Sequence, residues 1–458
     1  MNIQQLLVLA GSLVLGLVAP FGPNRAIAAD APAKKKPNVL FLFTDDQRAD
    51  TIRALGNPLI QTPNLDRLVE SGFAFRNAYC MGGNVGAVCL PSRTMLLTGR
   101  SLFHLPAPAD GPNFPAAMNA AGYITYHHGK KGNAPGAIHK VFQHTHYCND
   151  GKERSSGFPG REIADDAIGF LKDWKKDKPF FMYLAFANPH DPRVVNKEYR
   201  DKYDEAKMPL PGNYLPFHPF NNGDLKIRDE GLAPWPRTPE VVRRHLTDYY
   251  GVITCLDMEI GRILQSLRDT GEFDNTIIVF SSDHGLALGS HGLFGKQNIY
   301  EDGMKVPYFF TGPGIPKGRS DAFAYLYDIF PTVCELTGTP VPAGIDGKSL
   351  APVIAGKSKE VRDTMFLAYR AVQRSIRQGD WKLIRYPQVD KTQLFDLKTD
   401  PNEQRDLSAD PNQAGKVKEL LALLAATQKE FGDKQPLMVD NPQPAAVDLS
   451  FFKKKEGS

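Results

Sequence analysis

The sequence predicts an α/β fold in which a mainly parallel sheet is sandwiched by helices, followed by a smaller α+β domain with an antiparallel sheet. The first observation is a set of three apolar runs with no polar alternation, at 38–43 (NVLFLF), 180–186 (FFMYLAF) and 276–280 (TIIVF). Runs of this kind are typical of strands buried on both faces. The second is that helical patterns separate these runs, and such alternation favours parallel pairing. The third is that the hydrophobic pattern changes after Gly347, where short strands with one solvent-facing side are predicted.

The elements follow from local patterns in chain order. Thr62 and Pro63 predict a helix start, with Thr62 as its cap, and Pro239 stands at the start of the longest helix. Further strands are expected at 124–126, 306–311, 381–386 and 393–397, and helices at 162–174, 238–267 and 415–431. The segment 191–237 has little regular pattern, and a loop this long inside a domain is usually functional.

Length and composition limit the class of protein. A chain of 458 residues is too long for one compact core, so we expect a main domain at 29–360, a subdomain at 361–440 and a disordered tail at 441–458. Net charge is only +4, and Lys34–Lys36 and Lys453–Lys455 lie near the ends of the chain. We therefore expect no nucleic-acid partner.

The first 28 residues have the pattern of a signal peptide. The run 6–19 is apolar but too short to span a membrane, and Ala26-Ile27-Ala28 is a small-x-small cleavage site. We expect an exported protein, periplasmic or secreted, without stable membrane insertion. The segment before the run has no Lys or Arg, so an uncleaved anchor stays open as the alternative.

Five cysteines are present, at positions 80, 89, 148, 255 and 334. An odd number in an exported protein leaves at least one thiol unpaired. Cys255 and Cys334 lie in apolar helical stretches and are expected to be buried thiols. The sequence does not choose among the possible disulfide pairings.

Polar residues gather where the predicted strands end. These residues are Asp45, Asp46, Lys130, His190, Asp283 and His284. In open α/β sheets, sites form beyond the carboxyl ends of the strands, so we expect these side chains to meet. Three carboxylates at one place repel unless a cation joins them, and oxygen ligands favour Ca²⁺ or Mg²⁺ over zinc. His284 is not a typical ligand for such ions, and each acidic pair alone could be a turn or a helix cap.

Cationic side chains form a second candidate group, made of Lys130, His190, His291 and Lys296. Donors of this kind around a small hole suit a tetrahedral oxyanion. Each could also be an ordinary surface residue.

Cys89 opens an unusual stretch, Cys89-Leu90-Pro91-Ser92-Arg93. A phosphatase-type thiolate would need an arginine six positions on, but Arg93 is four positions on and position 95 is Met. A half-cystine or buried thiol would leave Pro91, Ser92 and Arg93 unexplained.

With Leu97-Thr98-Gly99-Arg100, this stretch resembles the C-x-P-S-R…L-T-G-R signature of the type I sulfatases, which belong to the alkaline phosphatase superfamily. The resemblance covers about residues 37 to 410. The other matching motifs are Gly129-Lys130, Asn188-Pro189-His190-Asp191-Pro192, Ser282-Asp283-His284-Gly285, Gly289-x-His291-Gly292 and Lys296.

The resemblance implies an alkaline-phosphatase-like fold and the hydrolysis of sulfate esters. A formylglycine-generating enzyme would oxidise Cys89 to formylglycine, whose hydrate attacks sulfur with one hydroxyl and expels sulfate with the other. By the same resemblance, Asp45, Asp46, Cys89, Asp283 and His284 hold Ca²⁺, or possibly Mg²⁺. Arg93 would orient the diol, Lys130 and Lys296 would bind the sulfate, and His190 or Lys296 would protonate the leaving oxygen.

One position departs from the family pattern. A histidine commonly follows the lysine at 130 and is credited with deprotonating the diol, but here Lys131, Gly132 and Asn133 follow. That role could pass to His128, His139 or His291.

The leading hypothesis is a sulfatase acting on a sulfated carbohydrate. Tyr199, Tyr203, Tyr214 and Trp235 in the loop 191–237 would suit a sugar pocket. The alternatives are a phosphonate or phosphate ester hydrolase using the same site, and a non-catalytic sulfoglycan-binding homologue.

Overall fold

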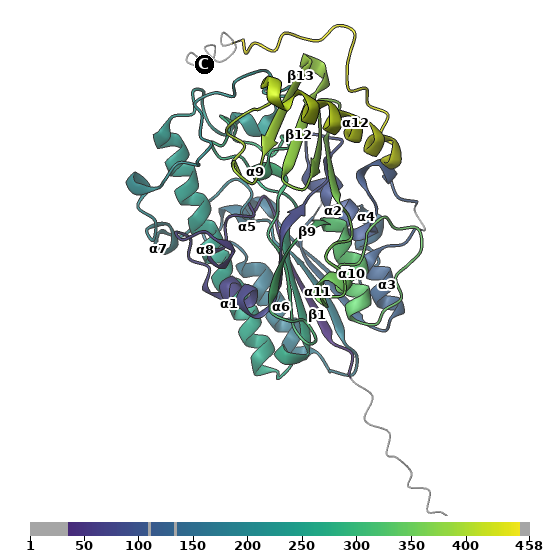
Figure 1. The fold of residues 1–458 in the computed structure, drawn as a ribbon. Helices are drawn as coiled ribbons and strands as arrows, with labels where there is room; N and C mark the ends of the chain where they lie inside the picture. Colours follow the sequence, from purple (N-terminus) through teal and green to yellow (C-terminus); the bar gives the residue numbers. More distant parts are fainter. Residues whose placement is uncertain (1–34, 109–110, 132–134, 449–458) are drawn as a thin grey trace, which may run out of the picture. The chain divides into compact units, whose positions relative to one another are not determined.

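The main sheet has eight strands, of which seven run parallel and one, β8, runs opposite to its neighbours (Figure 1). The computed structural model describes residues 35–108, 111–131 and 135–448. In spatial order the strands are β5 (His144–Cys148), β4 (Ile124–Lys130), β6 (Phe180–Ala185), β1 (Asn38–Thr44), β7 (Thr276–Ser282), β8 (Tyr308–Thr311), β2 (Phe73–Tyr79) and β9 (Gly318–Tyr325). The predicted signal peptide at 1–28 lies outside the described residues.

Strand β1 shows why the apolar runs lack alternation. Val39, Phe41 and Phe43 are buried in one core, whereas Leu40 and Leu42 are buried in a second core. Successive side chains of a strand point to opposite faces, so a strand with a core on each face must be apolar throughout.

Helices cover both faces of this sheet. The first core is closed by α2 (Cys89–Thr98), α3 (Phe114–Ala120) and α10 (Ile329–Leu336), and the second by α1 (Pro63–Ser71), α6 (Arg161–Asp173) and α8 (Pro239–Asp269). The short helices are α4 (Gly136–His139), α5 (Asp150–Ser155), α7 (Lys197–Arg200), α9 (Glu301–Met304) and α11 (Ala351–Ile354). The predicted cap residue Thr62 precedes α1, but its hydroxyl accepts from Arg53 N (3.0 Å) and makes no cap bond.

The second sheet is mostly antiparallel and confirms the predicted fold class. Its order is β13 (Lys391–Asp396), β12 (Trp381–Tyr386), β11 (Gln373–Gln378), β10 (Thr364–Tyr369) and β3 (Gly82–Gly83). Helix α12 (Ala414–Phe431) lies over this sheet (Figure 1). The expectation of one solvent-facing side is wrong for β12, because Lys382 is fully buried between the carboxylates of Glu301 and Glu403.

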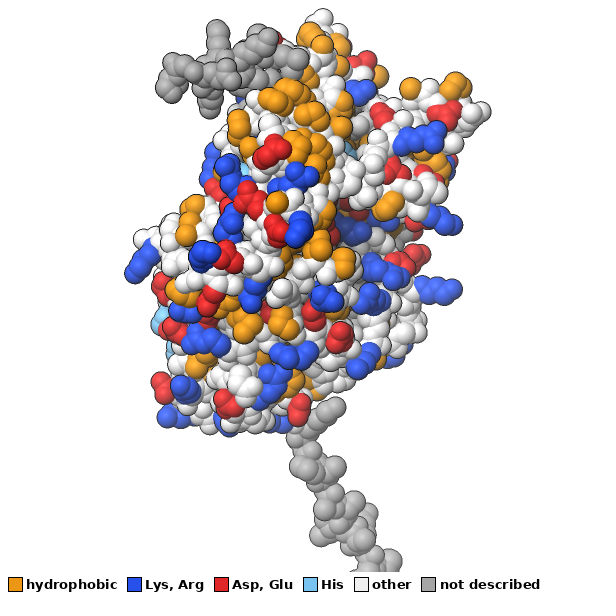
Figure 2. All heavy atoms as spheres, turned by 90° about the vertical axis from the view of Figure 1, so that its left-hand side faces the viewer, with side chains coloured by type: hydrophobic (Ala, Val, Ile, Leu, Met, Phe, Trp, Pro, Cys, Tyr) orange, Lys and Arg blue, Asp and Glu red, His pale blue; other side chains and the backbone are white. Residues whose placement is uncertain are grey.

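The segment 191–237 is irregular, as expected, and contains only α7 and two 3-10 helices, η3 (Glu205–Lys207) and η4 (Arg228–Leu232). Figure 2, which faces the side carrying α7 and α8, shows basic and acidic side chains interspersed. Within the described residues, no helix is both long and apolar enough to cross a membrane. The described part of the expected tail, 441–448, is held by main-chain hydrogen bonds from Gln443 to Gln388 and from Asn221 to Ala445.

All five cysteines lie in the described part of the chain and are free, buried thiols. The disulfides that the sequence left open are therefore not formed in this structure, and burial of Cys255 and Cys334 is as predicted.

Candidate active site

Neighbouring parallel strands bring the predicted acidic residues together. β1 pairs with β7 so that Thr44 lies beside Ser282, and the residues that follow, Asp45 and Asp283, leave the sheet at the same edge. The amide of Asp283 donates to Thr44 O (3.3 Å), and the amide of Asp46 donates to the Asp283 carboxylate (3.0 Å). The two strand ends are thus fixed to each other by one main-chain hydrogen bond and one bond to the Asp283 carboxylate.

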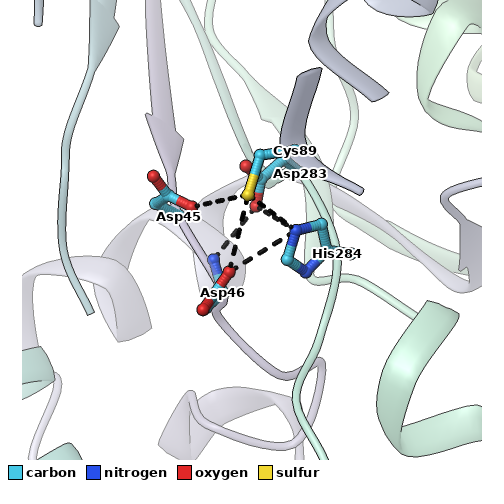
Figure 3. Close-up of side chains that lie close together, drawn as sticks. All are labelled: Asp45, Asp46, Cys89, Asp283 and His284. Carbon is cyan, nitrogen blue, oxygen red and sulfur yellow. Dashed lines mark hydrogen bonds and ion pairs between the residues drawn. The ribbon is translucent and has the colours of Figure 1, made fainter. Parts of the chain in front are cut away.

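Cys89 is the first residue of α2 and points at these acidic residues (Figure 3). Its Sγ lies 3.3 Å from Asp45 Oδ1, 3.9 Å from Asp46 Oδ1 and 3.1 Å from His284 Nε2. One ligand atom from each of Asp45, Asp46, Cys89, Asp283 and His284 lies within 4.8 Å of all the others. The N-terminus of a helix carries partial positive charge, which favours an anion at this place.

Ser92 and Arg93 attach α2 to the end of β7. The Ser92 hydroxyl donates to Asp283 O (2.7 Å), and Arg93 Nε donates to Asp283 Oδ2 (3.0 Å). Arg93 also donates to Thr44 O (3.2 Å) and is 1% exposed. Ser92 and Arg93 thus hold Asp283 in position.

Lysine side chains balance the carboxylates. Lys130 binds Asp45 at the end of β4, and Lys296 Nζ lies 2.9 Å from Asp46 Oδ1 and 3.2 Å from Cys89 Sγ. Burial alone would raise the pKa of the Asp45 carboxyl, but the charges of Lys130 and Arg93 outweigh burial and hold that pKa well below its usual range. The Asp45 carboxyl is therefore ionised at neutral pH.

Burial and the Asp45 charge raise the pKa of the Cys89 thiol well above its usual value. The unmodified side chain is therefore a protonated thiol. This environment opposes the thiolate-nucleophile interpretation of Cys89.

The donor set fits a divalent cation. Asp45, Asp46 and Asp283 supply carboxylate oxygens and are at most 1% exposed. His284 Nδ1 lies 2.9 Å from Gly285 O, a pure acceptor, so Nδ1 carries the proton and Nε2 presents its lone pair to the cluster. Lys130, Lys296 and Arg93 already match the three carboxylates in charge, so a divalent cation would give the site an excess of positive charge for an anionic substrate.

The main chain at Asp46 is held in an uncommon conformation. Asp46 has φ 67°, in the left-handed region that aspartate tolerates better than most residues. The buried Tyr249 hydroxyl donates to Asp46 O (2.6 Å) and fixes this turn. Strain at such positions persists where the surroundings impose it, which is common at functional sites.

His190 lies at the edge of the cluster. Its Nδ1 lies 2.8 Å from Arg154 Nη1 and 2.7 Å from Asp191 O, so the ring is held from that side. Nε2 faces the cluster, 3.9 Å from Asp46 Oδ2. Burial lowers the pKa of His190, so the ring is neutral near pH 7.

His291 makes its contacts elsewhere. Its Nε2 lies 3.0 Å from Asn213 Nδ2 and 4.0 Å from Glu403 Oε2, and its ring stacks on Tyr300 with centroids 3.8 Å apart. Burial lowers its pKa to about 4. The structure thus brings together every predicted site residue except His291.

The other two histidines considered for the missing base also have partners of their own. The ring of His139 packs at a tilt against those of His127 and Tyr147, with centroids 4.9 and 5.4 Å apart. His128 Nδ1 lies 2.7 Å from Asp166 Oδ2.

Two residues beside the site were not predicted from the sequence. Asp229, in η4, lies 3.9 Å from Lys296 Nζ, and Gln297 joins it by donating to Asp229 Oδ2 (2.6 Å) and to Gly86 O (2.9 Å). Gln297 could have been suspected as the neighbour of Lys296. Asp229 comes from the irregular loop and has no sequence signal.

Comparison with known proteins agrees with this geometry. The profile of the family described as "Sulfatase" matches residues 37–339, and the profile described as "N-sulphoglucosamine sulphohydrolase, C-terminal" matches 289–430. The chain is 30% identical to an N-acetylglucosamine-6-O-sulfatase of Bacteroides thetaiotaomicron, with 88% of each chain covered.

Solved structures show the same fold. One, in complex with its substrate D-glucosamine-2-N,6-O-disulfate, superposes with a TM-score of 0.73 and is 26% identical, over 88% of this chain and 99% of the other. A phosphonate monoester hydrolase of Agrobacterium radiobacter has the same TM-score at 22% identity, over 86% of this chain and 96% of the other, which shows the fold alone.

Proposed function

The chain belongs to the sulfatase family and is a sulfuric ester hydrolase, and from that premise we propose that it acts on a sulfated carbohydrate through a formylglycine made from Cys89 and a bound Ca²⁺ ion. The observation that carries the proposal is the buried convergence of three carboxylates, Cys89 and His284 beside two lysines. A carbohydrate substrate is supported by two similar proteins, an N-acetylglucosamine-6-O-sulfatase and a protein solved with a disulfated glucosamine.

Each side chain has a task that its position supports. Asp45, Asp46, Asp283 and His284 would hold the cation, which when bound supplies positive charge to the reacting sulfate. Lys130 and Lys296 would bind sulfate oxygens. Because electrostatic stabilisation acts strongly in a water-poor site, their burial increases the effect.

Nucleophile and leaving group would lie on opposite sides of the sulfur. Formylglycine at position 89 would supply, as its hydrate, the attacking hydroxyl, and the helix N-terminus there favours negative charge. The anionic sulfate beside the ring would raise the pKa of His190, so that the ring takes up a proton when substrate binds. With Nε2 facing the cluster, His190 would then give that proton to the leaving oxygen. Arg93 would orient the diol, and its hydrogen bonds also fix Asp283 and the end of β1.

The maturation step can be tested by mass spectrometry of the peptide containing Cys89, from protein made in its native host. We expect a lighter peptide in which the thiol sulfur has been replaced by a carbonyl oxygen. Only unmodified cysteine in active protein would contradict the proposal. Cys89→Ala should lose all turnover, whereas Cys334→Ala, at another buried thiol, should retain it.

The reaction class can be tested with matched aryl substrates. We expect kcat/KM for an aryl sulfate to exceed that for an aryl phosphodiester or phosphonate monoester with the same leaving group. The reverse order would favour the phosphonate or phosphate ester alternative. Binding of sulfated oligosaccharides without turnover, by fully modified protein, would favour the non-catalytic alternative.

The identity of the cation can be tested by removal and return. Chelation with EGTA should abolish activity, and Ca²⁺ should restore it more fully than Mg²⁺, because Mg²⁺ demands near-octahedral geometry and keeps its waters. Preferential restoration by Mg²⁺ would overturn the assignment of the ion and leave the proposed reaction intact.

A further inference from the structure

A second group of metal-ligating side chains lies at the edge of the main sheet and shares no residue with the acidic cluster. His128 on β4 and His146 on β5 are direct partners in the parallel register, and Asp166 on α6 lies beside both. The ligand atoms of the three lie within 4.8 Å of one another.

The contacts within this group converge on one atom. Asp166 Oδ2 lies 2.7 Å from His128 Nδ1 and 3.0 Å from His146 Nδ1, and it also accepts a hydrogen bond from the Tyr126 hydroxyl. A carboxylate oxygen offers about two lone-pair positions, so three N–H and O–H donors crowd it. A cation held by the two Nδ1 atoms and the carboxylate would relieve this crowding, and Tyr126 would remain as the hydrogen bond that orients Asp166.

The setting also suits an exchangeable ion. His128 is 4% exposed at its side chain, whereas His146 is 51% and Asp166 32% exposed, so one side of the group is fixed and the other is open to water. Asp166 also lines a surface cavity of about 550 Å³.

We propose that His128, His146 and Asp166 form a second metal site, which takes a borderline divalent cation, Zn²⁺ in the first instance, with water completing the coordination. Two imidazoles and one carboxylate are typical zinc ligands, whereas Ca²⁺ and Mg²⁺ prefer oxygen alone. The site joins the edge strand β5 to β4 and α6. Its metal would stabilise this edge of the sheet at His128, two residues before Lys130. The proposal does not depend on the proposed substrate.

The test is a calorimetric titration of tag-free, full-length protein with ZnCl₂ in a buffer that contains excess Ca²⁺ to fill the acidic cluster. We expect one saturable site with a Kd of roughly micromolar order or lower, and a rise in Tm with zinc. His146→Asn and Asp166→Asn should each weaken binding by about tenfold or more. Anomalous scattering at the zinc edge should place the ion between these side chains.

The matched control is His144→Asn, on the same strand, since the His144 ring packs against Tyr126 and Phe170 and is not among the three side chains of the proposed site. This variant should bind zinc like the unaltered protein. Absence of saturable binding, equal loss in His144→Asn and His146→Asn, or zinc found only at the acidic cluster would overturn the proposal. Sulfatase activity of zinc-free His146→Asn should be unchanged, so failure here is distinguishable from failure of the proposed function.

Discussion

At the scale of single residues, His190 is the proposed proton donor to the leaving oxygen. Its Nε2 faces the cluster while Arg154 and Asp191 hold the ring from the other side. A proton donor matters most when the leaving oxygen is a poor leaving group, as in a sugar alcohol, and least for a nitrophenol.

His190→Ala should therefore lower kcat on a sulfated sugar by about 10²- to 10⁴-fold and on nitrophenyl sulfate by much less. Steady-state kinetics on both substrates provides the measurement. The control is His104→Ala, at a half-exposed histidine bound to Asp346, which should leave both rates unchanged. Equal losses on the two substrates would show that His190 is not the donor.

The residues of the site were predictable where a motif or a strand end marks them. Cys89 and Arg93 stand in a specific signature, and Asp45 and Asp283 follow apolar strands, so parallel pairing implied that they meet. The partners of His291 were not predictable, because they include Asn213 from the irregular loop and Glu403 from a late turn. Contacts between irregular segments depend on the final packing and leave no periodic pattern in the sequence.

At the scale of elements, the two-residue strand β3 joins the two sheets. Gly82 and Gly83 pair in parallel with Ala368 and Tyr369 of β10, and the chain then runs on to α2 and Cys89. Gly82 has φ 113°, and a Cβ there would lie 1.9 Å from Ala368 O. This close approach requires glycine.

Gly82→Ala should destabilise the protein by at least about 2 kcal/mol, since alanine meets both an unfavourable φ and a main-chain oxygen. The matched control is Gly169→Ala in α6, where an added Cβ meets nothing within 4 Å and should stabilise by about 0.5–1 kcal/mol. Urea unfolding of the two variants measures both effects. Equal stability of the two would contradict the role given to β3.

The strands and helices that the sequence predicts best are those with long, uninterrupted apolar patterns. β1, β6 and β7 were predicted almost to their ends, and α8 to within two residues at its C-terminus. Strands β2 and β9 were not predicted, because polar and charged side chains such as Arg76 and Asp321 interrupt them. Those two residues pair with each other across the two strands, a contact visible only once the strands are adjacent.

At the scale of the whole molecule, a buried ion group ties the C-terminal sheet to the main one. Lys382 Nζ lies 2.9 Å from Glu301 Oε1 and 2.7 Å from Glu403 Oε1, and Tyr79 of β2 donates to Glu301 (2.7 Å). The sequence predicted a solvent-facing strand here because charged residues alternate in it. Lys382 can be buried only because two partners reach it from other segments. Glu301 lies about 80 residues earlier in the chain, and Glu403 stands in a late turn.

Lys382→Met should destabilise the protein by about 3–5 kcal/mol, because it leaves Glu403 buried without its lysine and removes one of the cations that surround Glu301. Lys398→Met, at an exposed lysine of the same domain, should change stability by less than about 0.5 kcal/mol. Chemical unfolding at neutral pH compares them. A loss below about 1 kcal/mol in Lys382→Met would mean that Lys382 is not needed to balance these two carboxylates.

Acid stability depends on buried neutral histidines. Burial lowers the pKa of His127 to about 3, so between that value and about 6.5 the unfolded chain binds a proton that the folded chain does not. Stability contributed by this group is therefore lost as pH falls below about 6.5, by up to about 1.4 kcal/mol per pH unit.

His127→Phe keeps a ring against Tyr183 and Phe142 but cannot be protonated. We expect the free energy of unfolding of this variant to fall less than that of the unaltered protein between pH 7.5 and pH 5. Urea unfolding at the two pH values gives the comparison. A parallel fall in both proteins would exclude His127 as a source of acid sensitivity.

The separation of Asp46 from Asp283, 237 positions along the chain, has a kinetic consequence. β1 is central, yet both of its neighbours in the sheet are supplied much later in the sequence. The entropy of closing so large a loop must be overcome before any cation can find its ligands, and topologies rich in distant contacts fold slowly. Binding of the ion should therefore occur at the last stage of folding, and it cannot initiate folding.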